Sequence, residues 1–369
     1  EEGLPGVSQH YIFDNYWPGS TETSLWKNVI AFLTEAASVQ TASPIYVEPS
    51  ELRVGGKGLS EYKKSVNMLD PWLGGWWRLG DIVEYEVSST TSIIKTASLY
   101  REDILEFRNK MCREQVELGK TEAPYYYIMP GKQHDQGEFV NLVNLMNEHG
   151  VQQYTLDEQV IIEGKVYSKG DVVIPLAQPF RPFIKEVMET QEFPERHYTP
   201  GGKLIRPYDI TSWSLPLHRQ VASYEIDVRS KELESNLIPI EGDYDLKDES
   251  RAQVVADAFL LPVESNESFR SAFQAVKEGF KVERLTEGLS LGAIDDSKGS
   301  FVVHQKGNNA AWNKIIKDLP FEAGAITDKR NLPAVQLEMP RIALVDTWFH
   351  DMAAGWTRFV FDSYDIPFT

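Results

Sequence analysis

Two kinds of hydrophobic spacing mark the first third of the chain. Apolar residues recur at about every 3.6 positions across residues 81–113, which predicts one long helix. The run at 29–33 is continuously apolar, as in a buried strand, and is followed by a single acid, Glu35. Ligands gather at the carboxyl ends of buried parallel strands, where a lone acid is a candidate general base. The alternative is a strand that simply ends at a solvated acid.

The middle of the chain alternates between strand and helix patterns after a break at 121–124. The first three elements are a strand at 125–130, a helix at 137–149 and a strand at 151–156. A strand, a helix and a strand in this order form a βαβ unit, which predicts a parallel sheet. Short strands follow between 160 and 174, and then a helix at 180–188.

A similar order of elements returns in the second half of the chain. It consists of a strand at 258–262, a helix at 268–278, strands at 280–285 and 299–304, and a helix at 309–319. Pro130 and Pro262, which lie 132 positions apart, end the first strand of each series. We therefore expect two related α/β modules, one at 122–217 and one at 218–340.

Bulk properties narrow the classes of function. The chain has 369 residues, enough for two or three domains, and a formal net charge of −18. That charge repels phosphate backbones and anionic bilayers, so we expect neither nucleic acid binding nor membrane-surface binding. No apolar run reaches about 18 residues, so no membrane insertion is predicted. The one cysteine, Cys112, lies in a helical pattern and is expected to be a packing thiol rather than a nucleophile.

Segments around the first apolar run resemble a known family. The segments are 13–20 (FDNYWPGS), 32–38 (FLTEAAS) and 74–85 (GGWWRLGDIVEY). They are similar to the closing part of the catalytic domain of the zinc carboxypeptidases, the carboxypeptidase A-like metallopeptidases. The resemblance implies that residues 1–118 are the C-terminal portion of such a domain, followed by further α/β modules. It also implies a zinc cofactor, a peptide substrate and a secreted or periplasmic bacterial protein.

By the same resemblance, two residues take part in catalysis. Glu35 matches the glutamate that activates the zinc-bound water, and Tyr16 matches a tyrosine on a loop that covers the substrate. Tyr11 is close enough in sequence to compete with Tyr16 for that role. The implied activity is hydrolysis of a peptide or amide bond near a C-terminus.

The zinc ligands that this family needs are not found in the sequence. The family pattern is His-x-x-Glu with a later His, yet none of the seven histidines has a Glu three residues further on. His134 has Glu138 at i+4, but a helix start with an acid near its positive end explains that pair better. We therefore expect the ligands upstream of Glu1, and we interpret both ends of the chain as cuts in a longer protein. A partial domain would expose the face that its missing strands cover.

The last range, 341–369, predicts a buried strand at 341–345 and a helix at 352–364. It resembles the truncated start of a class I glutamine amidotransferase-like domain, which implies amidotransferase or flavodoxin-like α/β modules. Amidotransferase chemistry would need a cysteine at a strand-to-helix elbow, and Cys112 is not at one. The alternative from a different class of function is a non-catalytic binding or assembly module, whose α/β layers present a cleft to a peptide or glycan.

Overall fold

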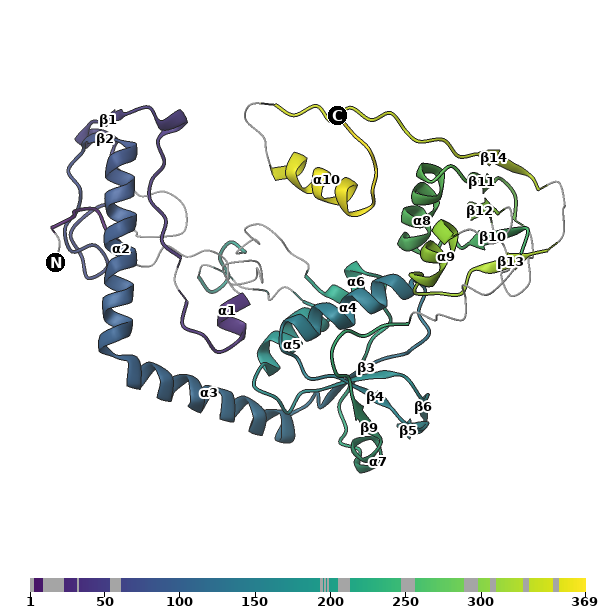
Figure 1. Ribbon diagram of the computed structural model, residues 1–369. Coiled ribbons are helices and arrows are strands. Elements are labelled where there is room, and N and C mark those ends of the chain that lie inside the picture. The colour runs from purple at the N-terminus through teal and green to yellow at the C-terminus, as the bar shows by residue number, and fades with distance from the viewer. Residues whose placement is uncertain are drawn as a thin grey trace. The chain divides into compact units, whose positions relative to one another are not determined.

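The computed structural model describes most of the chain. The residues outside its description are 1–2, 9–22, 32, 54–60, 193–194, 196, 198, 205–212, 247–255, 289–297, 306–309, 328–331 and 348–351. The chain divides into two compact units (Figure 1). Unit 1 consists of Glu1–Tyr125 and Leu176–Ser214, and unit 2 of Tyr126–Pro175 and Leu215–Thr369. The finer division into four ranges stays a prediction.

Unit 1 is mostly helical. Strands β1 (Ile45–Val47) and β2 (Gly75–Trp77) pair antiparallel. Two 21-residue helices follow, α2 (Leu79–Leu99) and α3 (Arg101–Thr121). The sequence predicts one helix here, but Tyr100 has a ψ of 25° and separates the two. The shorter helical elements of this unit are α1 (Thr23–Trp26), η1 (Gln40–Ala42), η2 (Pro49–Glu51) and α5 (Arg181–Met188).

The apolar run at 29–33 is not a strand. One of its residues lies outside the described part, and the others carry no strand assignment. Val29, Ile30 and Leu33 are 39, 47 and 54% exposed. The backbone N–H and C=O groups of a strand need a neighbouring strand, and within the described residues of unit 1 the paired strands are β1 and β2. The prediction of a buried strand that ends at Glu35 is therefore wrong.

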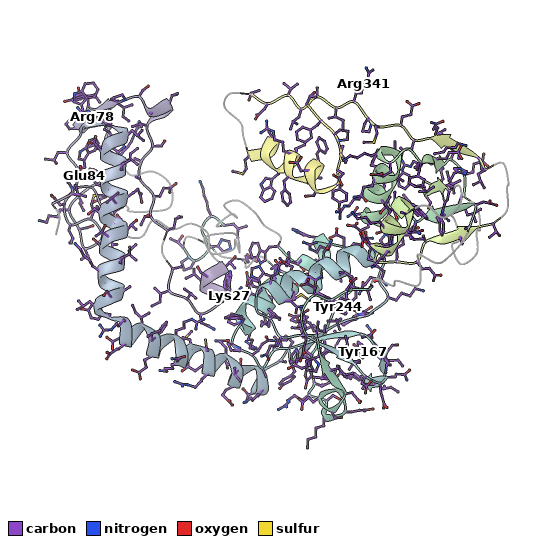
Figure 2. All side chains as sticks on the ribbon, in the orientation of Figure 1. Lys27, Arg78, Glu84, Tyr167, Tyr244 and Arg341 are labelled. Atoms are coloured by element: carbon purple, nitrogen blue, oxygen red, sulfur yellow. The ribbon has the colours of Figure 1, made fainter. Side chains whose placement is uncertain are left out.

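Helix α2 exposes a stripe of apolar side chains. Leu79, Val83, Val87 and Ile94 are separated by four or seven positions, which places them along one side of the helix. They are between 50 and 64% exposed, and α2 has no buried residue (Figure 2, where Glu84 marks the helix). Such a stripe ordinarily faces a core.

Unit 2 contains two five-stranded sheets. The first has the strand order β8-β3-β7-β4-β9 and the second the order β13-β10-β12-β11-β14. The strands of the first sheet are β3 (Tyr126–Met129), β4 (Tyr154–Leu156), β7 (Val172–Pro175), β8 (Tyr224–Ile226) and β9 (Leu237–Pro239). The strands of the second are β10 (Ala258–Leu261), β11 (Lys281–Leu285), β12 (Phe301–His304), β13 (Gly324–Ile326) and β14 (Ala334–Gln336). A separate two-stranded sheet pairs β5 (Val160–Ile162) with β6 (Lys165–Tyr167).

The pairings described in both five-stranded sheets are antiparallel, so the prediction of a parallel sheet is wrong. Strands β3 and β4 do run in the same direction, but β7 lies between them and is antiparallel to both. This is the split βαβ, or ferredoxin-like, connectivity. A strand–helix–strand pattern fixes the relative direction of two strands but not whether they are neighbours. A flavodoxin-like arrangement, which needs neighbouring parallel strands, is not what these two sheets have.

The order of strands repeats between the two sheets, but the first sheet includes β8 and β9 and therefore extends past the module boundary expected at 217/218. When the strands of each sheet are numbered in chain order, both sheets have the spatial order 4-1-3-2-5. Helix α4 (Gln136–Glu148) follows the first strand of the first sheet, and α8 (Asn266–Lys277) follows the first strand of the second. We call the first sheet with α4 the first module. The second module is the second sheet with α8 and α9 (Ala310–Lys317).

Each module buries apolar side chains from its helices. In the first module Phe139, Leu142 and Met146 of α4 are fully buried at helical spacing. In the second module α8 and α9 share a core cluster with one face of the sheet. Trp312 of α9 lies in this cluster, 1% exposed, with its ring 5.2 Å from that of Phe259 on β10. The pattern of apolar positions therefore corresponds to a real core in unit 2.

The last part of the chain carries a helix but not the predicted strand. Ile342 forms a single bridge to Phe368, and Val345 is 85% exposed. The helix predicted at 352–364 is present as α10 (Met352–Ser363). The other helices of unit 2 that the structure describes are α6 (Leu215–His218) and α7 (Lys231–Ser235). None of the helices in the described part combines the length and the apolar character needed to cross a bilayer.

Candidate functional site

Glu35 lies on an exposed segment that is anchored on both sides. The hydroxyl of Thr34 donates to the carboxylate of Glu86 on α2 at 2.7 Å. The indole N–H of Trp77 on β2 donates to the carbonyl of Ala37, also at 2.7 Å. Glu35 itself is exposed and has no strand conformation. Its backbone is therefore held close to α2 and β2, while its carboxylate is open to solvent.

The tyrosines predicted to cover a substrate fall outside the described residues. Tyr16 and Tyr11 both lie within 9–22. The assignment of Tyr16, or of Tyr11 in its place, as the residue that covers the substrate therefore stays a prediction.

The described residues offer no ligand set for the zinc that the resemblance implies. Among them, no group of three or more His, Cys, Asp or Glu side chains could hold a metal ion. The pair His134 and Glu138 does not form a site, because His134 is exposed and Glu138 is bonded elsewhere. The Nη1 atom of Arg219 donates to Glu138 at 2.6 Å. Glu138 lies in the first turn of α4, as the helix-start interpretation of this pair expects.

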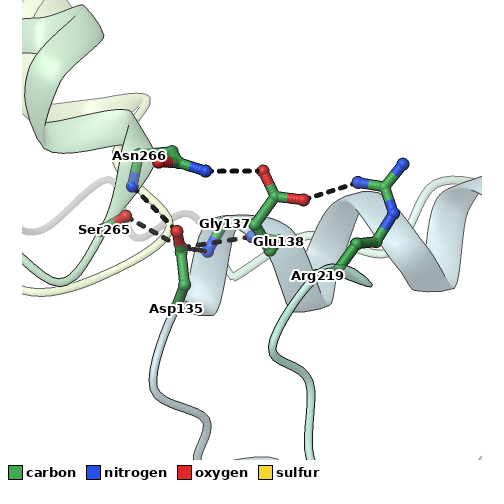
Figure 3. Close-up of polar contacts among 6 residues, drawn as sticks. All are labelled: Asp135, Gly137, Glu138, Arg219, Ser265 and Asn266. Atoms are coloured by element: carbon green, nitrogen blue, oxygen red, sulfur yellow. Dashed lines mark hydrogen bonds and ion pairs between the residues drawn. The ribbon is translucent and has the colours of Figure 1, made fainter. Parts of the chain in front are cut away.

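A cluster of polar contacts centres on Asp135, where the two modules meet (Figure 3). Its Oδ1 accepts the backbone N–H groups of Gly137 at 2.8 Å and Glu138 at 3.2 Å, so Asp135 caps α4. From the second module, the Ser265 hydroxyl donates to the same oxygen at 3.0 Å. The backbone N–H of Asn266, the first residue of α8, donates to Oδ2 at 2.8 Å. Asp135 is 4% exposed, so four protein donors replace its water.

Glu138 adds a second bond between the modules. The side-chain amide of Asn266 donates to Oε1 of Glu138 at 3.2 Å, while Arg219 donates to Oε2. Figure 3 shows Glu138 between these two partners. The start of α8 is therefore bound to two acids at the start of α4, and a guanidinium balances one of the charges.

A third acid, Glu267, faces the same place. Burial raises the pKa of Glu267, the nearby Arg270 opposes the rise, and the charges of Asp135 and Glu138 add to it. Burial also raises the pKa of Tyr364, beyond α10, and the same three acids raise it further. The oxygens of Asp135 accept donors from the protein itself, so the arrangement suits a joint between modules better than a reaction centre.

The pattern of apolar positions does not reveal this cluster. The expectations from sequence name neither Asp135 nor Ser265 as a helix cap. A signal was present in each case, because Asp or Ser directly before a helical pattern is typical of an N-cap. No local pattern shows that the two caps touch across 130 positions of chain.

Comparison with known proteins adds no family. No family model matches this chain, and no curated protein or solved structure matches it either. The predicted relation to zinc carboxypeptidases therefore stays a prediction from sequence, and the split βαβ topology rests on the strand pairings.

Proposed function

We propose that the region around Glu35 belongs to a hydrolase of the zinc carboxypeptidase type, in which Glu35 is the general base. The observation that carries this proposal is the anchoring of Thr34 and Ala37, which holds the segment while the Glu35 carboxylate stays exposed. A general base must reach the proton that it abstracts, so a fixed backbone and an open carboxylate suit the role. The reaction would be cleavage of a peptide or amide bond near a C-terminus.

The proposal places the metal ligands outside the described residues, upstream of Glu1. A bound zinc ion would supply a water of lowered pKa. The catalytic role of this chain is limited to Glu35 and its contacts. Glu35 would accept a proton from that water, and the contacts would position it. Tyr16 stays the proposed residue for covering the substrate.

The exposed stripe on α2 also supports this proposal. Leu79, Val83, Val87 and Ile94 form an apolar side that has no cover in the described part of unit 1. A helix that closes a larger catalytic domain would carry such a face.

The test compares this chain with the natural polypeptide extended upstream of Glu1. Zinc per chain and release of C-terminal amino acids from a peptide would be measured for both. We expect the extended protein to bind one zinc and to hydrolyse the peptide. Glu35→Gln should keep the zinc and lower kcat by about 10²–10⁴-fold, the usual contribution of a general base. Glu84→Gln, which changes an exposed acid on α2, is the matched control and should leave both readouts unchanged.

Two results would overturn the proposal. One is an extended protein that binds no zinc, and the other is a zinc-loaded Glu35→Gln variant with full activity. Either result would leave the binding or assembly module as the remaining hypothesis for this chain.

A further inference from the structure

The two modules of unit 2 meet through equivalent positions. Asp135 and Ser265 are the N-cap residues of α4 and α8, and each helix follows the first strand of its module. The Ser265 side chain makes no capping bond to its own helix, and its hydroxyl donates to the Asp135 carboxylate, so the two N-cap positions are in contact. The two modules therefore touch at equivalent helix starts, with Asp135 as the acceptor of both bonds.

We propose that Asp135 is a shared helix cap that couples the two modules, so that the N-termini of α4 and α8 open and close together. An ordinary N-cap satisfies amide groups of its own helix. The Asp135 carboxylate accepts two donors from the first module and two from the second (Figure 3). Loss of this carboxylate leaves donors without an acceptor in both modules at once.

The two helix dipoles at this joint favour the closed arrangement, whereas the charge of Glu267, which lies near Asp135 and Glu138, opposes it. The N-terminus of each helix carries the positive end of its dipole, and both ends face the one negative charge of Asp135. Because Asp135 is nearly buried, its charge depends on these donors for stabilisation. Separation of the modules would remove the two donors that come from Ser265 and Asn266, which is half of the set.

The close approach of the modules depends on Gly137. A Cβ atom at this position would lie 2.9 Å from Cγ of Glu267 and 3.5 Å from Cγ of Pro320, both in unit 2 beyond α4. The first distance is shorter than side chains tolerate, so a larger residue would force the Glu267 side chain to move, and its Cβ would also lie only 3.2 Å from Oδ1 of Asp135. The absence of a side chain at Gly137 therefore helps the two helix starts to approach each other.

Hydrogen exchange on the intact chain tests the proposal. Asp135→Asn replaces an acceptor oxygen by an NH₂ donor, which then faces other donors. We expect exchange to accelerate at residues 136–140 and also at 266–270, by about tenfold or more, the effect of losing one hydrogen bond to a charged group. Asp227→Asn, at an exposed acid in unit 2, is the control and should change neither segment. Acceleration confined to 136–140 would show an ordinary local cap and overturn the proposal.

Ser265→Ala tests the coupling from the second module and decides the matter if Asp135→Asn does not fold. A local role for Ser265 would affect only 266–270. Under the proposal, exchange at 136–140 also accelerates, because the shared carboxylate loses a donor. In the double variant, the increase in exchange rate should be smaller than the product of the increases in the two single variants, because both substitutions remove the same interaction. Two results would overturn the proposal. One is an increase in the double variant that equals this product, and the other is an unchanged exchange rate at 136–140 in Ser265→Ala.

Discussion

The two units use helices of similar amphipathic spacing in opposite ways. In unit 1, α2 spans 21 residues and buries none of them. In unit 2, α9 spans eight residues and buries Trp312, Ile315 and Ile316. The spacing of apolar residues therefore predicts a helix and its apolar face. The spacing does not predict whether other described residues pack against that face.

The difference has an energetic consequence. Full burial of a large apolar side chain contributes about 1.5–3 kcal/mol. The side chains of α9 have this contribution, whereas the α2 stripe, at 50% exposure or more, lacks most of it. A helix with little tertiary support is only marginally stable in water. We therefore expect unit 2 to hold the stable core and α2 to open first.

The largest effect should come from a matched pair of tryptophans. Trp312→Ala removes a ring that is 1% exposed and lies between Phe259 and Phe280. We expect it to lower the free energy of unfolding by about 3–5 kcal/mol, because it leaves a cavity in the core. Trp76→Ala in unit 1 removes a ring that is 53% exposed and makes an edge contact with Tyr46.

For Trp76→Ala we expect a loss below about 1.5 kcal/mol, the value of an aromatic pair. Denaturant unfolding followed by circular dichroism would compare the two variants with the parent chain. Equal losses would show that unit 1 holds a core as stable as that of unit 2.

A smaller effect should come from a buried hydroxyl in unit 2. The phenol of Tyr126 donates to Oε1 of Glu234 at 2.5 Å, and Arg229 donates to the same oxygen at 2.6 Å. Burial, together with the hydrogen bond to Glu234, raises the pKa of Tyr126 to about 12. Tyr126→Phe should cost about 1.5–3 kcal/mol, the range for a hydrogen bond to a charged group.

The control for this variant is Tyr46→Phe in unit 1, at a side chain that is 51% exposed. We expect it to change the free energy of unfolding by less than about 0.5 kcal/mol. If both variants proved silent, the bond between Tyr126 and Glu234 would contribute nothing to the stability of unit 2.

The sequence predicts unit 2 better than unit 1 because its local signals agree with its packing. Helix α4 and strand β3 lie where the apolar spacing places them, and the order of elements repeats as expected. The neighbours of each strand were predicted wrongly, since β7 comes between β3 and β4 from a later part of the chain. The strands predicted at 29–33 and 341–345 are absent for a related reason. Apolar character alone does not provide a partner strand.

In the candidate sites too, local features could be predicted from the sequence and tertiary contacts could not. An N-cap at Asp135 could be predicted from its place before a helix, because capping is a local property. Its bond to Ser265 could not, since it depends on how two modules dock. Glu35 was singled out by the apolar run before it, which is not a strand, and by resemblance. The structure adds that its neighbours Thr34 and Ala37 are anchored, which no sequence pattern shows. Its catalytic role stays a prediction.

The smallest effect concerns pH. Burial raises the pKa of Glu267, and Asp135 and Glu138 add to the rise against Arg270. The folded state therefore binds this proton more tightly than the unfolded state, so the charged form costs stability above the raised pKa. That cost disappears as the pH falls through the raised pKa toward the ordinary value of 4.5.

Glu267→Gln mimics the neutral form of this acid. We expect the variant to be more stable than the parent at neutral pH, and the difference to vanish below the ordinary pKa of the acid. The measurement is the difference in free energy of unfolding across pH, in which contributions of unchanged groups cancel. Glu84→Gln on α2 should give a flat difference, because that acid is exposed. A Glu267→Gln variant that is less stable at neutral pH would show that the attraction of Arg270 outweighs burial, and that the joint between the modules needs all three of its acids charged.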